Sequence, residues 1–177
     1  MQQPIVISGA GILGCYISCA LSLQGIDSIV LEKKDDEVED SVRTITLNPF
    51  SKNLLDKIGI ENDYSMINKM EVKDFDGTGK IVFKSSEIGM DHLAYVSDFA
   101  TLLMAIRKKA SEKILYKEEI ININNKGDLN EVTLSSGKVI KTNLIISSDG
   151  KNSKLANKIP KSDKDYFQTA LTFLASA

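Results

Sequence analysis

The chain has few of the side chains that most often build metal centres. Its 177 residues include one histidine, His92, and two cysteines, Cys15 and Cys19. A structural zinc site takes about four nitrogen or sulfur ligands, and no other cysteine or histidine is present to complete one. The cysteines are four residues apart, which places them on one helical face, where small core residues are expected. We therefore expect no metal site, and an ordinary loop position for His92.

Long apolar runs and clustered positive charge are also missing. No apolar run approaches the length of about 18 residues that indicates a transmembrane helix, although 42% of the chain is apolar. The 22 lysines and arginines are scattered and balanced by 24 acidic residues, so no basic stripe for nucleic acid is expected. Met1 to Pro4 lead directly into an apolar strand, which leaves no room for a signal peptide. These features predict one globular domain in the cytoplasm.

A glycine pattern lies between two predicted strands near the start of the chain. Residues 4–8 form an apolar, β-branched run typical of a buried strand, and residues 28–31 predict a second one. Between them, Gly9-Ala10-Gly11-Ile12-Leu13-Gly14 opens a predicted helix that extends to Gln24 and ends at Gly25. Glu32 follows the second strand, near the spacing of about 20 residues found in dinucleotide-binding units.

Each glycine of this pattern has a distinct physical role. Gly9 permits a sharp turn from strand to helix, Gly11 leaves the main chain open to a pyrophosphate, and Gly14 lets the helix pack closely on the strands. Phosphates are favoured at the helix N-terminus because its N–H groups are unpaired and the helix dipole is positive there. Glu32 can accept hydrogen bonds from ribose hydroxyls. The pattern predicts a dinucleotide site; the alternative is a glycine-rich turn without a ligand.

Two further helices and several strands are predicted beyond a charged, solvated loop at residues 33–40. Asn48 and Pro49 begin a helix that ends at Gly59, and Ser97 or Asp98 caps another helix that ends in basic residues. Residues 71–75 and 80–84 flank Asp-Gly-Thr-Gly and predict a hairpin. The remaining strands are expected at residues 92–96, 114–124, 131–134, 139–141 and 143–146.

This order of features resembles the FAD-dependent aromatic-ring hydroxylases, and most of all the ubiquinone-biosynthesis hydroxylases. Three motifs carry the resemblance: the glycine pattern with Glu32, the segment RTITLNPFSKNLLDKIGI that begins at Arg43, and Asp149-Gly150-Lys151-Asn152-Ser153. Residues 92–106 also resemble the family's segment that enters the helix after the first hairpin. The resemblance implies that Arg43 contacts the flavin and that the Asp-Gly motif lies near the FAD and NAD(P)H phosphates.

The residues alone leave two of these assignments open. Arg43 could equally form a surface ion pair with the acidic loop before it, although a guanidinium also suits a pyrophosphate. Without the resemblance, Asp149-Gly150 indicates only a turn with a helix cap. The predicted cofactor-binding residues are Gly9, Ala10, Gly11, Ile12, Leu13, Gly14, Glu32, Lys33, Arg43, Asp149 and Gly150.

The chain also departs from the family pattern. The family usually has Gly-Ala before the aspartate and an arginine three residues after the serine, whereas this chain has Ser147, Ser148 and Ala156. A lysine at position 151, 154 or 158 could replace the arginine, but only as a point charge without bidentate geometry. The family's later Gly-Asp motif and most of its substrate domain are absent from these 177 residues.

We therefore expect an α/β fold with a parallel sheet. Residues 1–164 would form a Rossmann-like FAD-binding domain, with the 71–90 hairpin assignable to it or to a substrate sheet. Residues 165–177 alternate apolar and polar side chains and predict the first strand of an incomplete, mostly antiparallel substrate domain. An apolar strand at an open edge is a poor end for a finished domain, so a fragment, or a split or decayed gene, is expected.

The resemblance implies the N-terminal part of an NAD(P)H- and FAD-dependent monooxygenase that hydroxylates a polyprenylated phenol in ubiquinone biosynthesis. The flavin would perform the chemistry, so no catalytic side chain is predicted. We expect the chain to be inactive alone, with downstream sequence or a partner chain completing the sheet and a lipid substrate favouring peripheral membrane association. The alternatives are a non-catalytic nucleotide-binding remnant and an NAD-dependent dehydrogenase, and the hairpins from residue 71 onward argue against the dehydrogenase.

Overall fold

A parallel sheet around the glycine pattern forms the centre of the fold. The computed structural model describes residues 3–38, 42–74, 77–150, 153, 155 and 166–169. Four strands in this part of the chain pair in the order β12-β1-β2-β8, and every pairing is parallel. The strands are β1 (Ile5–Ser8), β2 (Ser28–Glu32), β8 (Ile114–Tyr116) and β12 (Ile145–Ser147). The predicted α/β class with a parallel sheet is confirmed.

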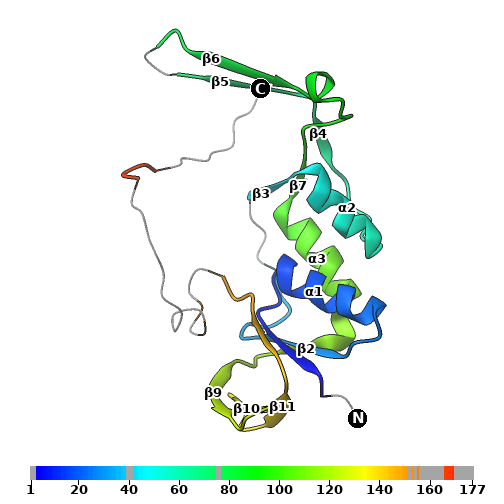
Figure 1. The fold of residues 1–177 in the computed structure, drawn as a ribbon, viewed down its shortest axis with the longest axis vertical. Helices are drawn as coiled ribbons and strands as arrows, with labels where there is room; N and C mark the ends of the chain where they lie inside the picture. Colours follow the sequence, from blue (N-terminus) through cyan, green and yellow to red (C-terminus); the bar gives the residue numbers. More distant parts are fainter. Residues whose placement is uncertain are drawn as a thin grey trace.

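The two central strands bury both of their faces, which gives the molecule three layers (Figure 1). Ile7 and Val30 face a core under the helices, whereas Val6 and Leu31 face a second core under an antiparallel sheet. This alternation follows from the period of two along a strand. The covering elements are α1 (Ile12–Leu23) and α3 (Phe99–Lys109) on one face, and β9 (Ile120–Asn125), β10 (Asn130–Leu134) and β11 (Val139–Thr142) on the other.

Short-range signals set the helix boundaries. The helix α2 (Pro49–Lys57) begins where the Oδ1 atom of Asn48 accepts a hydrogen bond from the Ser51 N–H at 2.7 Å. The helix α3 begins in the same way at Asp98, which accepts from the Thr101 N–H at 2.7 Å. The predicted caps are thus confirmed, with Asp98 rather than Ser97 in that role. Gly25 follows α1 with a φ of +69°, a conformation that favours glycine.

The cysteines of α1 contribute to the core under the helices. Cys15 is fully buried and Cys19 is 7% exposed. Burial raises the pKa of the Cys15 thiol to about 12 and also raises that of Cys19. The expected packing role is confirmed.

Two smaller antiparallel sheets extend from the helical side (Figure 1). One has the order β3-β7-β4, with β3 (Thr44–Leu47), β7 (Ala94–Asp98) and β4 (Ser65–Ile67). The other is the predicted hairpin, β5 (Lys69–Lys73) paired with β6 (Lys80–Lys84). Two short 3₁₀ helices, η1 (Ser85–Ile88) and η2 (Ser111–Lys113), complete the described elements. The sequence analysis did not predict β3 or β4.

The expected single strand over residues 114–124 is wrong. Ile114–Tyr116 joins the parallel sheet beside β2, whereas Ile120–Asn125 pairs with β10 in the antiparallel sheet. Between them Lys117 has a φ of +58°, which ends the extended conformation. The expected strand at 165–177 falls mostly outside the described residues. Residues 166–169, the described part, do not form a strand.

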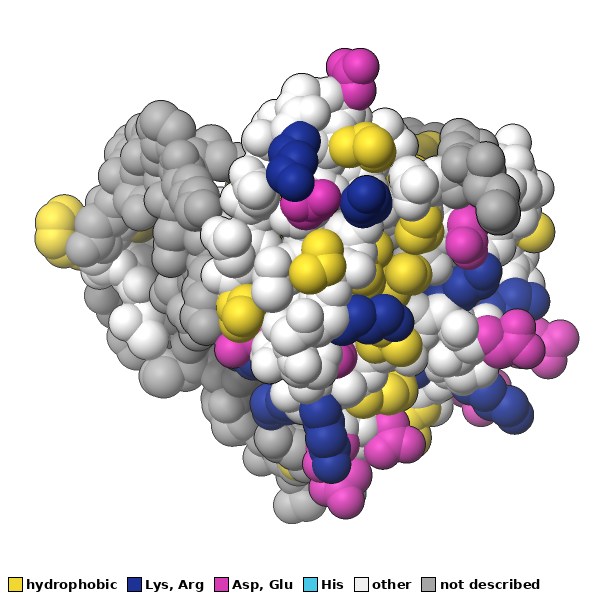
Figure 2. Space-filling model, turned by 90° about the horizontal axis from the view of Figure 1, so that it is seen from below, with side chains coloured by type: hydrophobic (Ala, Val, Ile, Leu, Met, Phe, Trp, Pro, Cys, Tyr) yellow, Lys and Arg dark blue, Asp and Glu magenta, His cyan; other side chains and the backbone are white. Residues whose placement is uncertain are grey.

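Charges of both signs share the face seen from below (Figure 2). Basic and acidic side chains are interspersed there, with hydrophobic side chains between them. None of the helices in the described ranges has the length and apolarity to cross a membrane.

The break between β8 and β9 predicts the effect of a β-branched residue at position 117. Lys117→Val should lower the free energy of unfolding by about 1–2 kcal/mol, because a β-branched side chain is strained at positive φ. A continuous strand would instead be stabilised by valine. Urea denaturation measures the difference, with Lys73→Val in the exposed strand β5 as the matched control. A gain of stability at position 117 would contradict the break.

Candidate cofactor-binding site

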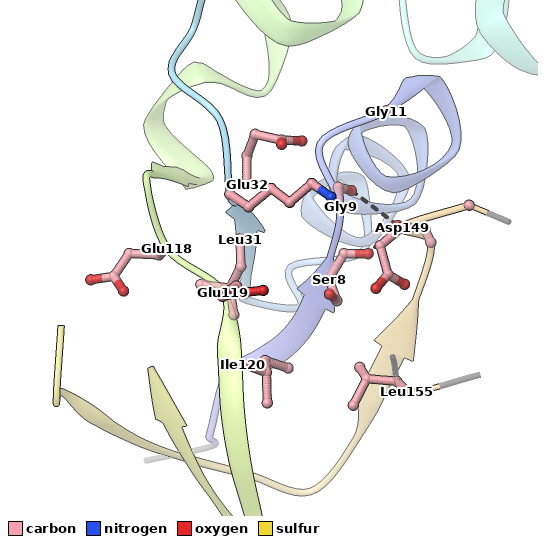
Figure 3. A pocket seen from close by; sticks show the side chains of 13 residues that line it. Ser8, Gly9, Gly11, Leu31, Glu32, Glu118, Glu119, Ile120, Asp149 and Leu155 are labelled. Atoms are coloured by element: carbon pink, nitrogen blue, oxygen red, sulfur yellow. Dashed lines mark hydrogen bonds between the residues drawn. The ribbon is translucent and has the colours of Figure 1, made fainter. Parts of the chain in front are cut away.

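A cavity of about 300 Å³ opens where strands of the parallel sheet end (Figure 3). Its lining comes from the ends of β1 and β2, from the segment after β12, and from the connection between β8 and β9. Ligands of open α/β sheets bind at this carboxyl edge. The volume is at the lower end of the range of about 300–1,000 Å³ for ligand pockets. The lining residues are Ser8, Gly9, Gly11, Leu31, Glu32, Lys33, Glu118, Glu119, Ile120, Ser148, Asp149, Gly150 and Leu155.

The three glycines of the pattern differ in what surrounds them. Gly9 has a φ of +100°, and a Cβ there would lie 2.8 Å from main-chain atoms of Asp149. A Cβ at Gly14 would overlap the Gly9 carbonyl oxygen. At Gly11 a Cβ would meet no atom within 4 Å, although Gly11 lines the cavity. Packing among the described residues therefore requires glycine at positions 9 and 14, but not at position 11.

The N-terminus of α1 suits an anion. Gly11 is its N-cap, no side chain caps it, and its first turn contains no acidic residue. The first intrahelical bond runs from the Cys15 N–H to the Gly11 carbonyl, so the N–H groups before Cys15 have no partner within the helix. Ile12 and Leu13 do not line the cavity: Ile12 packs against the core and Leu13 is 61% exposed. These two residues can contribute only through their main chain.

Glu32 is anchored to the glycine turn. Its Oε2 atom accepts a hydrogen bond from the Ala10 N–H at 3.0 Å and lies 3.5 Å from the Arg107 guanidinium. Its Oε1 atom accepts from the Lys34 N–H at 3.1 Å. Ala10 is fully buried, and its N–H donates a hydrogen bond to Glu32 instead of pointing to a ligand in the cavity. The sequence analysis missed Arg107, whose one signal is that it is one of only two arginines in the chain.

The segment after β12 meets the glycine turn directly. The Ser148 hydroxyl lies within hydrogen-bond distance of the Ser8 and Gly9 carbonyl oxygens, at 2.9 and 3.0 Å. The Ser147 hydroxyl donates to Asp149 Oδ1 at 2.7 Å. The two serines that replace the family's Gly-Ala therefore tie this loop to the turn and orient the Asp149 carboxylate. Lysines 151, 154 and 158 and position 156 lie outside the described residues.

Arg43 is not among the residues that line the cavity. Its guanidinium carbon is 4.3 Å from the centre of the Phe99 ring, and its carbonyl accepts from the Phe99 N–H at 2.9 Å. It forms no ion pair with any described residue of the acidic loop, residues 33–38. The structure thus brings together Gly9, Gly11, Glu32, Lys33, Asp149 and Gly150. Contact between Arg43 and the cofactor stays a prediction.

Two acidic residues that the sequence analysis missed complete the lining. The Glu118 N–H donates to the Glu32 carbonyl at 3.0 Å, which folds the β8–β9 connection back over β2. Hydrogen bonds from Ser136 and Ser135 hold the pKa of Glu118 below its ordinary value. Glu119 and Ile120 follow it into the lining. The break after Tyr116, marked by three consecutive charged residues, could have identified this segment.

Carboxylates outnumber cations in the described lining. The lining contains four acidic residues and a single basic one, Lys33, although the Glu118 side chain points away from the cavity (Figure 3). Such a lining repels phosphate but accepts hydroxyl groups, and the uncapped end of α1 is left as the part that favours negative charge. Two apolar residues of the lining that are not fully buried, Ile120 and Leu155, offer a surface for a planar ring. The arrangement suits a nucleotide whose sugar meets the carboxylates and whose phosphates meet the helix.

Comparisons with known proteins identify the family of the chain. The family model for the FAD binding domain matches residues 2–174. The chain is 26% identical over 197 aligned residues to the mitochondrial ubiquinone biosynthesis monooxygenase COQ6 of Danio rerio, covering 94% of this chain and 40% of that protein. It is 26% identical over 170 residues to 3-demethoxyubiquinol 3-hydroxylase of Escherichia coli (strain K12), covering 87% of this chain and 43% of that protein.

Solved structures show the same fold. A mutant of PqsL from P. aeruginosa has a TM-score of 0.78 at 19% identity, covering 94% of this chain and 48% of that chain. The p-nitrophenol 4-monooxygenase PnpA from Pseudomonas putida DLL-E4 has a TM-score of 0.73 at 17% identity, covering 89% and 43%. This chain spans less than half the length of each of these four proteins. Since the family model matches nearly all of its residues, the chain belongs to the FAD binding domain family.

Proposed function

We propose that the cavity holds the adenosine end of FAD, with the pyrophosphate at the N-terminus of α1. Gly11 carries this proposal, because it lines the cavity and a Cβ there would meet no protein atom within 4 Å. Packing against the described residues gives no reason for a missing side chain at this position. Close approach of a pyrophosphate to the main chain does give one.

The lining residues would divide the binding between them. Glu32 would accept a hydrogen bond from a ribose hydroxyl, and Ile120 and Leu155 would contact the base. The N–H groups of the first turn of α1 would donate to the pyrophosphate. Bound FAD would supply the redox chemistry, and the chain would position it.

We further propose that the complete protein is an NAD(P)H-dependent monooxygenase acting on a polyprenylated phenol of ubiquinone biosynthesis. Support comes from the names of two relatives, a ubiquinone biosynthesis monooxygenase and a 3-demethoxyubiquinol 3-hydroxylase. A polyprenyl tail on the substrate would bring the protein to a membrane surface.

The β5–β6 hairpin supports a requirement for sequence outside this chain. Met70 pairs with Phe83 and Val72 with Ile81, which places four apolar side chains on one face. They are between 41% and 57% exposed. A two-stranded hairpin with such a face is marginal by itself, and the chain spans 40% and 43% of the two relatives. The remaining sequence or a partner chain would cover this face and supply the phenol pocket.

The first test of FAD binding is Gly11→Ala. The variant should keep its stability within about 1 kcal/mol, because alanine fits the local backbone and meets empty space. Its affinity for FAD should fall by about tenfold or more, since a methyl group would stand where the pyrophosphate approaches. Flavin fluorescence titration measures the affinity.

Gly79→Ala is the matched control, because it makes the same substitution in the exposed β5–β6 turn without a steric clash. Equal FAD affinity of the wild type and Gly11→Ala would show that the pyrophosphate does not lie at this position. Tighter binding of NAD than of FAD would favour the dehydrogenase alternative.

The second test concerns Arg43. Arg43→Lys keeps the positive charge but loses the planar fork, so contact with the cofactor predicts a loss of FAD affinity of about tenfold. Phe99→Leu, which removes the ring beneath the guanidinium, shows what stacking alone contributes. If Arg43→Lys binds FAD like the wild type, the role of Arg43 is confined to its contact with Phe99.

The third test is turnover by the 177-residue chain. It should oxidise NADH or NADPH, if at all, without hydroxylating a phenol, because an exposed flavin ring releases hydrogen peroxide instead of transferring oxygen. The assay follows nicotinamide oxidation, peroxide and hydroxylated product together. Coupled product formation above about 1 per second would match ordinary enzymes, and would show that this chain needs no further sequence.

A further inference from the structure

Arg107 connects four elements beneath the cofactor site. It projects from the last turn of α3, and its side chain is 11% exposed. Its Nε atom donates to the Ala10 carbonyl at 2.9 Å, and its Nη2 atom lies 3.5 Å from Glu32 Oε2. The guanidinium carbon lies 5.7 Å from the centre of the Tyr116 ring on β8. One side chain thus links α3 to the glycine turn, to the end of β2 and to β8.

The contact with Glu32 determines which part of its carboxylate remains for a ligand. A carboxylate has about four acceptor positions. Ala10 and Arg107 occupy those of Oε2, and the Lys34 N–H occupies one of Oε1. Among the described residues, one position of Oε1 is left. Glu32 can therefore accept one further hydrogen bond from a hydroxyl group, and Arg107 helps to set the direction of that bond.

The contact with Ala10 orients the peptide that leads into α1. In a trans peptide the carbonyl oxygen and the next N–H point in opposite directions. Because Arg107 holds the Ala10 carbonyl toward α3, the Gly11 N–H points away from Arg107. That N–H belongs to the uncapped first turn, and Gly11 lines the cavity. Arg107 thereby fixes the direction of a donor that faces the proposed pyrophosphate position.

We propose that Arg107 is a positioning residue for the cofactor, acting through Glu32 and through the Ala10–Gly11 peptide; this rests on the FAD site proposed above. Arginine suits the role because its planar fork can meet two acceptors at once, whereas lysine presents one ammonium group. A purely structural arginine would hold α3 to the sheet without any link between its effect and that of Glu32.

A double-mutant cycle separates the two roles. FAD affinity is measured by fluorescence titration for the wild type, Arg107→Met, Glu32→Ala and the double variant, with thermal unfolding of each. Arg107→Met should weaken binding about 30-fold in the wild type but only about threefold when Glu32 is already alanine, because the shared contact is gone. Lys108→Met, one residue away and exposed, is the matched control and should bind FAD normally.

The outcomes distinguish this proposal from the one on which it rests. Equal losses from Arg107→Met in both backgrounds, or no loss, would overturn the positioning role while leaving the FAD site intact. A wild type that does not bind FAD would overturn both. If Arg107→Met does not fold, Arg107→Lys takes its place in the cycle, with about a tenfold loss expected because one of the two contacts survives. A loss that does not depend on Glu32 would again reject the role.

Discussion

Close contact between the glycine turn and the loop after β12 is the constraint on which the cofactor site depends. A Cβ at Gly9 would lie 2.8 Å from the main chain of Asp149, and the Ser148 hydroxyl reaches the Ser8 and Gly9 carbonyl oxygens. Parallel pairing of β1 with β12 brings these distant segments side by side. Asp149 and Gly150 therefore reach the cavity through main-chain packing, which a side chain at position 9 would prevent.

The carboxylates of the site are held mainly by hydrogen bonds, and Glu32 also has a cationic partner, Arg107. Glu32 is held by main-chain N–H groups and Arg107, Asp149 by Ser147, and Glu118 by the serines of the β10–β11 turn. Hydrogen bonds to the ionised form lower the pKa of a carboxyl group, as they do for Glu118, so the carboxylate stays charged at neutral pH. Carboxylates beside the uncapped N-terminus of α1 favour a ligand that is neutral at one end and anionic at the other.

Features set by neighbouring residues could be predicted from the sequence, and features set by pairing could not. The caps at Asn48 and Asp98 act on an N–H group three residues away, and the positive φ of Gly9 belongs to the glycine pattern itself. The break at Lys117 depends on pairing, because residues 114–116 join the parallel sheet and residues 120–125 join the antiparallel sheet. The contact between Glu32 and Arg107 joins residues 75 positions apart, for which no local pattern exists. Likewise β3 and β4 are strands because β7 lies between them.

Burial of the two thiols in α1 has a consequence for the chemistry of the native chain. Burial raises the pKa of the Cys15 thiol to about 12, so the thiol stays protonated at neutral pH. Cys19 is buried beside it under the same core, and these are the only cysteines in the sequence. The thiolate is the nucleophile that attacks an alkylating reagent, so labelling of the fully buried Cys15 requires an opening of the layer between α1 and the sheet. The rate at which Cys15 is modified therefore measures how often α1, the helix whose N-terminus lies at the cavity, detaches from the sheet.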